Sequence, residues 1–380
     1  MELSFLQHYW WALVSLLGAL LVFLLFVQGG QSLIFCTAKT EPQKNLLIHL
    51  LGHKWGLTYT TLVTFGGAIF ASFPLYYATS FGGAYWLWIT ILLLFVLQAV
   101  SYECRDKVGN LLGTKTYDIF LFLNGLLGSV MLGVAVGTFY TGGAFTIDKM
   151  ALTHLQAPVI SLWANGWHGL DALFHPFNLL MGAGLYLAAC TLALLFFIKT
   201  ADDVEIRAKA HKQVTIVGPL FVLGFVALLI YLFCLTGYSV HPNTGAITPE
   251  PYKYLHNMLE LVWPAVVLLI GVVLVLVGLG SQILKKGKYS FWLTSLGVVL
   301  AVFPILIIAA YNQTAYFIST VALQNSLTLQ NSSSSLFTLK VMSYVSLLIP
   351  FVLAYIVYVW YALTHRPISQ DELESNTKEY

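Results

Sequence analysis

The stretch YWWALVSLLGALLVFLLFV, residues 9–27, contains no charged side chain. A helix of about 20 mainly apolar residues crosses the ~30 Å hydrocarbon layer of a bilayer, and a backbone in lipid must satisfy its own hydrogen bonds. This stretch therefore predicts a membrane-spanning helix. Further stretches of the same kind follow it and bring the predicted spans to nine: Thr58–Ala78, Tyr85–Val100, Ile119–Tyr140, Phe177–Ile198, Val214–Tyr238, Met258–Leu279, Trp292–Tyr311 and Leu339–Leu363.

The composition of the whole chain agrees with a polytopic membrane protein. Of its 380 residues, 58% are hydrophobic and only 9% are charged, whereas soluble domains carry about 25% charged residues. This excludes a water-soluble enzyme, a nucleic-acid-binding protein and a disordered tail. We expect one all-α transmembrane domain over residues 1–380, with about nine helices packed as two four-helix bundles plus one peripheral helix.

The distribution of basic residues predicts the orientation in the membrane. All but three of the 18 Lys and Arg follow the odd-numbered spans, and the three exceptions are Lys149, Lys253 and Lys340. Basic loops mark the cytoplasmic side, so the N-terminus is expected outside and the C-terminus in the cytoplasm. The segment Glu41–Trp55 mixes Leu with Lys and His, and is expected to form a helix lying in the membrane interface.

Few polar side chains fall within or beside the spans, and each is a candidate for function because charge is costly in a membrane. Glu103 and Arg105, at the inner end of the third span, suit either a structural ion pair or a proton relay. Gln28 and Gln31 flank two glycines at the end of the first span. Further amides fall within other spans: Gln98, Asn124 and Asn178.

Metal-binding signals are absent from the predicted spans. No His lies in the middle of a span, so a haem held at membrane depth by axial ligands has no histidine to bind it. The four Cys have no metal-ligand spacing. Taken alone, the residues predict a scaffold with a thin polar lining and no catalytic constellation.

Several sequence blocks, in a fixed order, resemble one family. They are Gly66–Ala78 (GGAIFASFPLYYA), residues 100–107, His175-Pro176-Phe177, Asn325–Leu329 (NSLTL) and the segment 374–377 (ESNT). Together they are similar to subunit II of cytochrome bd quinol oxidase. The resemblance implies a respiratory complex in a bacterial inner membrane that oxidises quinol, reduces dioxygen to water and generates proton motive force. It also implies that two b-type haems and one d-type haem reside in subunit I, and that this subunit is haem-free.

The departures from the family pattern concern acidic residues. Where the family has Asp-Gly-Phe-Asp, this chain has Gln28-Gly29-Gly30-Gln31. Where the family has Asp after a motif Trp, this chain has Gly56 after Trp55. Where the family has a later Trp-Asp pair, this chain has Gln330-Asn331. An amide can order water but cannot release a proton near neutral pH.

We therefore expect the protons to enter mainly through subunit I. The candidates for a polar water or proton path in this chain are Gln28, Gln31, Glu103, Arg105 and Asn331. A bound quinone at Trp55 is a further hypothesis, and an interfacial anchor is the alternative for that ring.

Two other functions stay open at this point. A secondary transporter is also polytopic with midplane polar groups, although no midplane acid pair is present here to bind an ion. A purely structural subunit without a role for protons or oxygen is the second. The expected partners are subunit I, lipid, quinol and oxygen in the complex, with small single-helix accessory subunits as an open question.

Overall fold

The computed structural model describes residues 2–107, 109–153, 159–284 and 287–364. The longer helices are α1 (Glu2–Leu24), α2 (Phe26–Thr37), α3 (Glu41–Ser72), α5 (Tyr85–Cys104), α6 (Thr114–Leu123), α7 (Ser129–Thr141), α8 (Pro176–Thr200), α9 (Val204–Cys234), α10 (Lys253–Leu261), α11 (Trp263–Ile283), α12 (Ser290–Ala310), α14 (Leu336–Ser346) and α15 (Ile349–Thr364). Short helical pieces are α4 (Pro74–Tyr77), η1 (Ala78–Gly82), η2 (Asn124–Gly128), η3 (Lys149–Thr153), η4 (Leu170–Phe174), η5 (Leu323–Asn325) and α13 (Leu329–Ser332). Two antiparallel hairpins complete the fold: β1 (Phe145–Ile147) with β2 (Ser161–Trp163), and β3 (Gly237–Val240) with β4 (Ile247–Glu250).

Within the described residues, seven helices or joined helix runs are long and apolar enough to cross a membrane. They are Glu2–Thr37, Tyr85–Cys104, Thr114–Thr141, Pro176–Thr200, Val204–Cys234, Trp263–Ile283 and Ser290–Ala310. The pair α14 and α15, bent by 41°, would add an eighth. The remaining predicted span, Thr58–Ala78, covers the second half of α3 and continues through α4 to the start of η1. Its α3 part contains several threonines from Thr58 to Thr64, and α3 is not among the seven.

The helix predicted to lie in the interface over Glu41–Trp55 is not a separate element, so that prediction is wrong. A capping box starts α3, in which the Thr40 side chain accepts from the Gln43 backbone and the Gln43 side chain accepts from the Thr40 backbone. No break follows, and the same helix continues to Ser72. Gly56 alone does not interrupt it, because one glycine inside a helix costs only about 1 kcal/mol.

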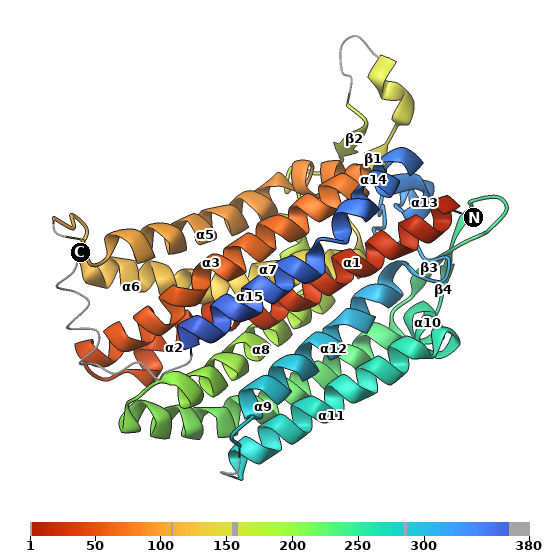
Figure 1. The fold of residues 1–380 in the computed structure, drawn as a ribbon. Helices are drawn as coiled ribbons and strands as arrows, with labels where there is room; N and C mark the ends of the chain where they lie inside the picture. The colour runs from red at the N-terminus through yellow and green to blue at the C-terminus, as the bar shows by residue number, and fades with distance from the viewer. Residues whose placement is uncertain (1, 108, 154–158, 285–286, 365–380) are drawn as a thin grey trace.

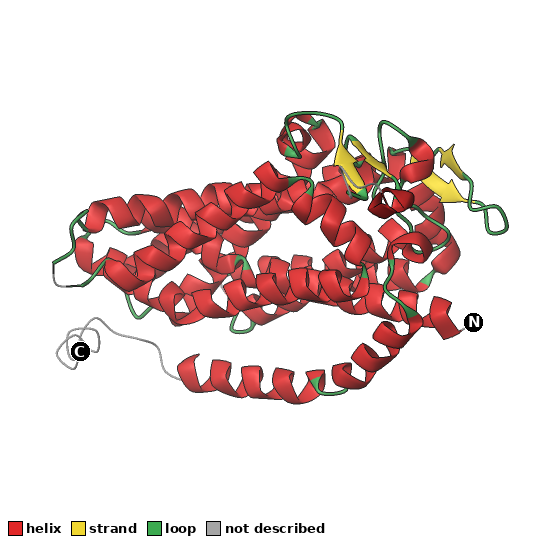
Figure 2. Ribbon diagram, turned by 90° about the horizontal axis from the view of Figure 1, so that it is seen from above, coloured by secondary structure: helices red, strands yellow, loops and turns green. Residues whose placement is uncertain are grey.

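The helices form two groups side by side. One contains α1 with α2, α3, α5, and α6 with α7; the other contains α8, α9, α11 and α12. They meet where α2 and α7 pack on α8 and where α1 packs on α12. The α14–α15 pair runs along one side of the molecule (Figures 1 and 2). This arrangement agrees with the predicted two bundles plus a peripheral helix.

Small residues allow the closest of these contacts. A Cβ on Gly133 of α7 would lie 2.5 Å from the Cα of Gly182 on α8, and one on Gly29 of α2 would lie 2.2 Å from the Ala189 carbonyl. Side chains larger than hydrogen would force these helices apart. Helices in lipid associate through such close packing, because lipid is as apolar as the helices themselves.

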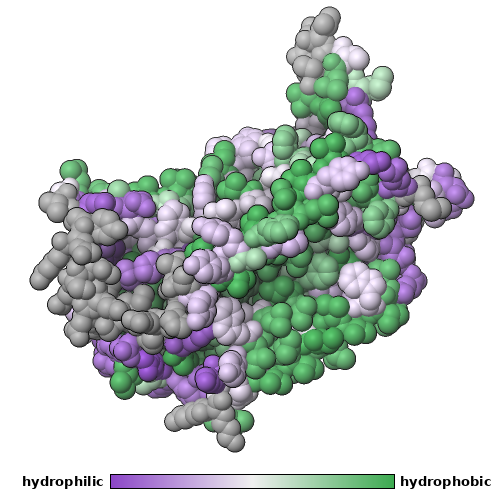
Figure 3. All heavy atoms as spheres, viewed as in Figure 1, coloured by the Kyte–Doolittle hydropathy of each residue, from purple (hydrophilic) through white to green (hydrophobic). Residues whose placement is uncertain are grey.

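The two ends of the molecule differ from its flanks. Figure 3 shows hydrophobic side chains along the flank of α11 and α12 and hydrophilic ones toward the ends. The β-hairpins, α10 and α13 lie at the end that holds the start of α1 (Figure 1). A buried aromatic cluster that includes Trp11, Tyr76, Phe139 and Tyr316 packs near this end. The hairpin end is thus tightly packed, and the opposite end carries the ionic contacts described below.

Candidate functional site

Three buried amides meet between α2, α5 and η2. The Gln28 Nε2 donates to Gln98 Oε1 at 3.2 Å and to Asn124 Oδ1 at 3.5 Å, and all three side chains are fully buried. The segment η2 is a π-helical turn inserted between α6 and α7, a feature often found at functional sites. Its Gly125 lets the chain approach α2, since a Cβ there would lie 2.5 Å from the Gln28 carbonyl oxygen.

This cluster is incompletely satisfied by the protein. Gln28 Oε1, Gln98 Nε2 and Asn124 Nδ2 are buried without a hydrogen-bond partner in the part of the chain that the structure describes. An unpaired buried polar group costs about 1–3 kcal/mol, and three of them together are unusual for a native interior. The geometry suits small polar molecules such as water as additional partners.

The polar contacts continue along the same two helices toward the end of α5. Gln31, three residues after Gln28 on α2, donates through Nε2 to the Tyr102 hydroxyl at 3.0 Å. Tyr102 follows Gln98 by four residues on α5 and stacks on Trp55, with ring centroids 5.8 Å apart. We call Gln28, Gln31, Gln98, Tyr102 and Asn124 the amide row. Trp55 thus lies beside the row and packs against it.

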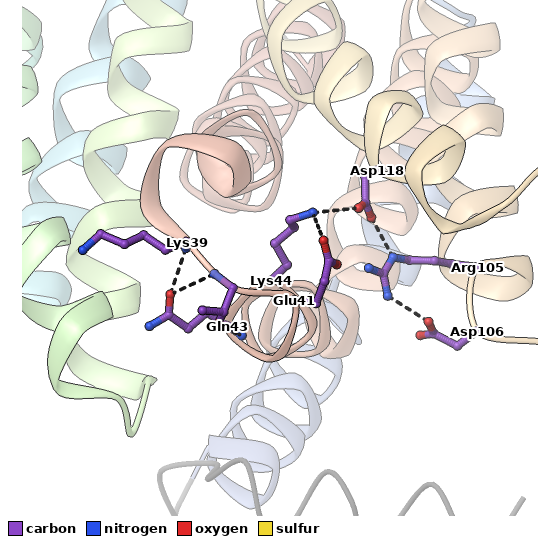
Figure 4. Close-up of polar contacts among 8 residues, drawn as sticks. Lys39, Glu41, Gln43, Lys44, Arg105, Asp106 and Asp118 are labelled. Carbon is purple, nitrogen blue, oxygen red and sulfur yellow. Dashed lines mark hydrogen bonds and ion pairs between the residues drawn. The ribbon is translucent and has the colours of Figure 1, made fainter.

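An ionic network lies one helical turn beyond Tyr102 (Figure 4). The Arg105 Nε donates to Asp118 Oδ1 at 2.7 Å, and its Nη1 donates to Asp106 at 2.8 Å. Lys44 of α3 lies 3.8 Å from Asp118. The side chains of Arg105 and Asp118 are only 3% and 2% exposed, so this ion pair is buried at the junction of α3, α5 and α6.

The predicted pairing of Glu103 with Arg105 is wrong. Glu103 is exposed, whereas Arg105 turns inward and donates to Asp118. Residues two apart on a helix do not face each other, which explains the result. Asp118 is an acid at the start of the fourth predicted span, where the helix dipole favours it, but the sequence did not show that Arg105 is its partner.

Asn331 lies apart from the other predicted residues. It forms a capping box with Thr328 at the start of α13 and also donates to the Ser326 carbonyl at 2.9 Å. Its own carbonyl accepts from Lys149 at 2.9 Å. The α13 turn is at the hairpin end, whereas α2 extends to the opposite end (Figure 1). The structure therefore brings Gln28 and Gln31 together with Trp55 and Arg105, but not with Asn331.

Sequence reasoning also missed the environment of Lys54, which it placed among the polar residues of the predicted interfacial helix. The residue is 1% exposed, and its Nζ has no hydrogen-bond partner among the described residues. The Nζ lies 4.5 Å from the centre of the Trp360 ring of α15, a cation–π geometry. Burial lowers the pKa of the amine to about 8.

Comparison with known proteins identifies the family. Residues 6–363 match the sequence model described as "Cytochrome bd terminal oxidase subunit II". The chain belongs to this family. It is 24% identical to the cytochrome bd-I ubiquinol oxidase subunit 2 of Escherichia coli strain K12, with 98% of this chain and 97% of the relative covered. It is 27% identical to the cytochrome bd ubiquinol oxidase subunit 2 of Bacillus subtilis strain 168, with 95% and 96% covered.

A solved structure shares the fold of this subunit II chain. A chain of the bd oxidase from Geobacillus thermodenitrificans superposes with a TM-score of 0.59 and 14% sequence identity, covering 94% of this chain and 98% of that one. The expected family and the all-α membrane fold are therefore confirmed.

The described side chains include no metal-binding cluster. No group of three or more His, Cys, Asp or Glu among them could hold a metal ion. The apolar cavity between the two helix groups, about 180 Å³ in volume, is lined by residues such as Leu21, Phe65, Val136 and Phe225 and by no described His or Cys.

Proposed function

We propose that this chain is the haem-free subunit II of a cytochrome bd-type quinol oxidase in a bacterial inner membrane. Its partner in this proposal is a subunit I that carries two b-type haems and one d-type haem, oxidises quinol and reduces dioxygen. The main support for this proposal is the family match over residues 6–363. The relatives from E. coli and B. subtilis are named as ubiquinol oxidase subunits and align over nearly their full lengths.

The proposed orientation places the N-terminus outside and the C-terminal end of α15 in the cytoplasm. In Figure 1 the start of α1 and the end of α15 lie at opposite ends of the molecule, which agrees with an odd number of crossings. The ionic network of Lys44, Arg105 and Asp118 lies at the end of α5, the end assigned to the cytoplasm by the basic loops.

Within the complex, we propose that the amide row holds a file of water between α2 and α5. The support is the set of unpaired atoms on Gln28, Gln31, Gln98 and Asn124, which can donate to water or accept from it. Amides do not release protons near neutral pH, so the protons for oxygen reduction enter mainly through subunit I. Glu103 is exposed and lies outside the row.

The Arg105–Asp118 pair gives this row a charged end. An arginine stays protonated at any relevant pH, and its buried positive charge disfavours passage of a free cation at that point. Trp55 stacks on Tyr102, which supports the packing role of the ring; the quinone contact and the accessory subunits stay predictions.

Co-purification with spectroscopy tests the proposed function. The chain is expressed with and without its subunit I partner, and the haem absorption spectrum and quinol:oxygen turnover of each preparation are recorded. Haem is expected only in the preparation that contains both subunits, and turnover only there. Haem bound to the isolated chain, or solute transport by the isolated chain in liposomes, would contradict the proposal.

A further inference from the structure

Two histidines share one face of α3 near its start. His49 and His53 are four residues apart, and their ring centroids lie 4.2 Å from each other with the planes at 66°. Residues at this spacing point in the same direction from a helix. Two histidines so placed are the arrangement by which helical HExxH motifs bind zinc.

The ring nitrogens of this pair are available to a ligand. Five other described histidines make hydrogen bonds through a ring nitrogen: His8, His168, His211, His241 and His256. His175 is different, because its Nδ1 is buried without a partner among the described residues. Neither His49 nor His53 has such a partner within the described ranges, and the contact recorded for them is the one between their two rings. His53 is exposed and His49 is half-buried, so the pair can be reached from outside the protein.

Imidazole has an ordinary pKa of about 6.5, so the neutral ring is its main form at cytoplasmic pH. Both residues precede the predicted span, which starts at Thr58. Neutral imidazole is the form that binds a metal.

One acid and one base act on the pair. The carboxylate of Asp106, which is 69% exposed, acts electrostatically on His49. The positive charge of Lys54 disfavours a metal cation bound nearby. Its Nζ, however, lies over the Trp360 ring of α15. Gly52 lies between the two histidines, and a Cβ there would be 3.4 Å from the Tyr102 ring. The pair is therefore next to the end of α5, close to the amide row.

We propose that His49 and His53 form an exchangeable site for a late first-row divalent metal ion such as Zn²⁺. Each imidazole supplies one nitrogen ligand, and water supplies the remaining contacts. Imidazole nitrogens suit Zn²⁺, Cu²⁺ and Ni²⁺. Structural zinc sites use four protein ligands, and no described cluster of three or more such groups exists here, so the ion exchanges with the solution.

Zinc binding to the purified oxidase complex, with subunit I present, tests the site. The complex is stripped with a chelator and dialysed against graded Zn²⁺, and bound zinc is measured by mass spectrometry. Loss of a residue that supports a metal ligand lowers metal affinity by roughly 10- to 100-fold. Removing a ligand itself is expected to lower the affinity by at least this factor. His49→Ala and His53→Ala are each expected to weaken binding of one Zn²⁺ by that factor, with an unchanged haem spectrum.

Two further variants make the result specific to this pair. His211→Ala removes another histidine, whose Nε2 contacts the Gln282 carbonyl at 3.0 Å, and is expected to leave zinc binding intact. Asn45→His/His53→Ala rebuilds a pair of the same spacing one turn earlier, because Asn45 is exposed on the same face of α3, and is expected to regain zinc. A His49→Ala/His53→Ala variant that binds Zn²⁺ as tightly as the native complex would overturn the proposal, as would failure of the displaced pair to regain it.

Discussion

Asp118→Asn is the sharpest test of the ionic network at the end of α5. Asp118 accepts from Arg105 Nε at 2.7 Å and lies 3.8 Å from Lys44 Nζ, with its side chain 2% exposed. The substitution keeps the shape of the side chain and removes the charge that faces a buried guanidinium.

The magnitude follows from the burial of both partners. Removing one member of a buried ion pair costs about 3–5 kcal/mol, because the other charge is left without compensation. The exposed Asp106 still contacts Arg105, which favours the lower part of this range. Unfolding entropies of about 2.1 cal/mol/K per residue, applied to 380 residues, convert this cost into a fall in Tm of roughly 4–6 °C.

Thermal denaturation of the purified complex, followed by tryptophan fluorescence, measures this effect. The matched control is Asp106→Asn, which removes the exposed partner of the same arginine and is expected to cost less than about 1 kcal/mol. Arg105→Met/Asp118→Leu is expected to recover much of the loss, since an apolar replacement of a buried pair is often neutral. Equal Tm values for Asp118→Asn and Asp106→Asn would refute the reasoning.

Three further predictions address the amide row, the buried amine and the exposed acid. Gln28→Leu leaves Gln98 and Asn124 without their shared partner. We expect the stability of the protein to fall by about 1–3 kcal/mol and oxygen-reduction turnover to slow at full haem content. Unchanged turnover would argue against a water file. Lys54→Met removes a cation whose pKa is lowered from 10.5 to about 8 in the folded chain. A depressed lysine pKa means that the unfolded chain binds more protons, so native stability rises with pH between about 8 and 10.5. The variant should therefore exceed the native protein in stability by at most about 3 kcal/mol below pH 8, with the advantage lost toward pH 10.5 in denaturation scans; an advantage that does not vary with pH would contradict this. Glu103→Gln should leave turnover unchanged because the side chain is exposed outside the row, whereas lost turnover with intact haem would make Glu103 a proton carrier.

The sequence predicted the spans well because apolarity is a local property. Runs such as residues 9–27 are recognisable without knowledge of their neighbours, and the structure places them within helices. Span prediction was least successful in α3. Its threonines lower its apolarity, and its first turns continue directly into the predicted span. Helix continuity depends on the absence of a break, and the mixed polarity of Glu41–Trp55 suggested a boundary that the backbone does not have.

The candidate site was only partly predictable. Gln28 and Gln31 were selected from their position at the end of the first span, and both are in the amide row. The partners of Arg105 could not be obtained from the sequence, because they depend on how α5 is rotated and on where α6 begins. Neighbours in sequence, Glu103 and Arg105, face opposite environments, whereas Arg105 and Asp118 are 13 residues apart and in contact.

By itself, the sequence determined that this chain is a polytopic helical membrane protein with most of its basic residues on one side, since chain composition alone decides which segments prefer lipid to water. Only the tertiary structure decided which polar groups meet. The amide contacts among α2, α5 and η2, the Arg105–Asp118 pair and the contact of Lys54 with the Trp360 ring are products of helix packing. Contacts between helices depend on their rotation and separation, and these are settled by all the packed surfaces together.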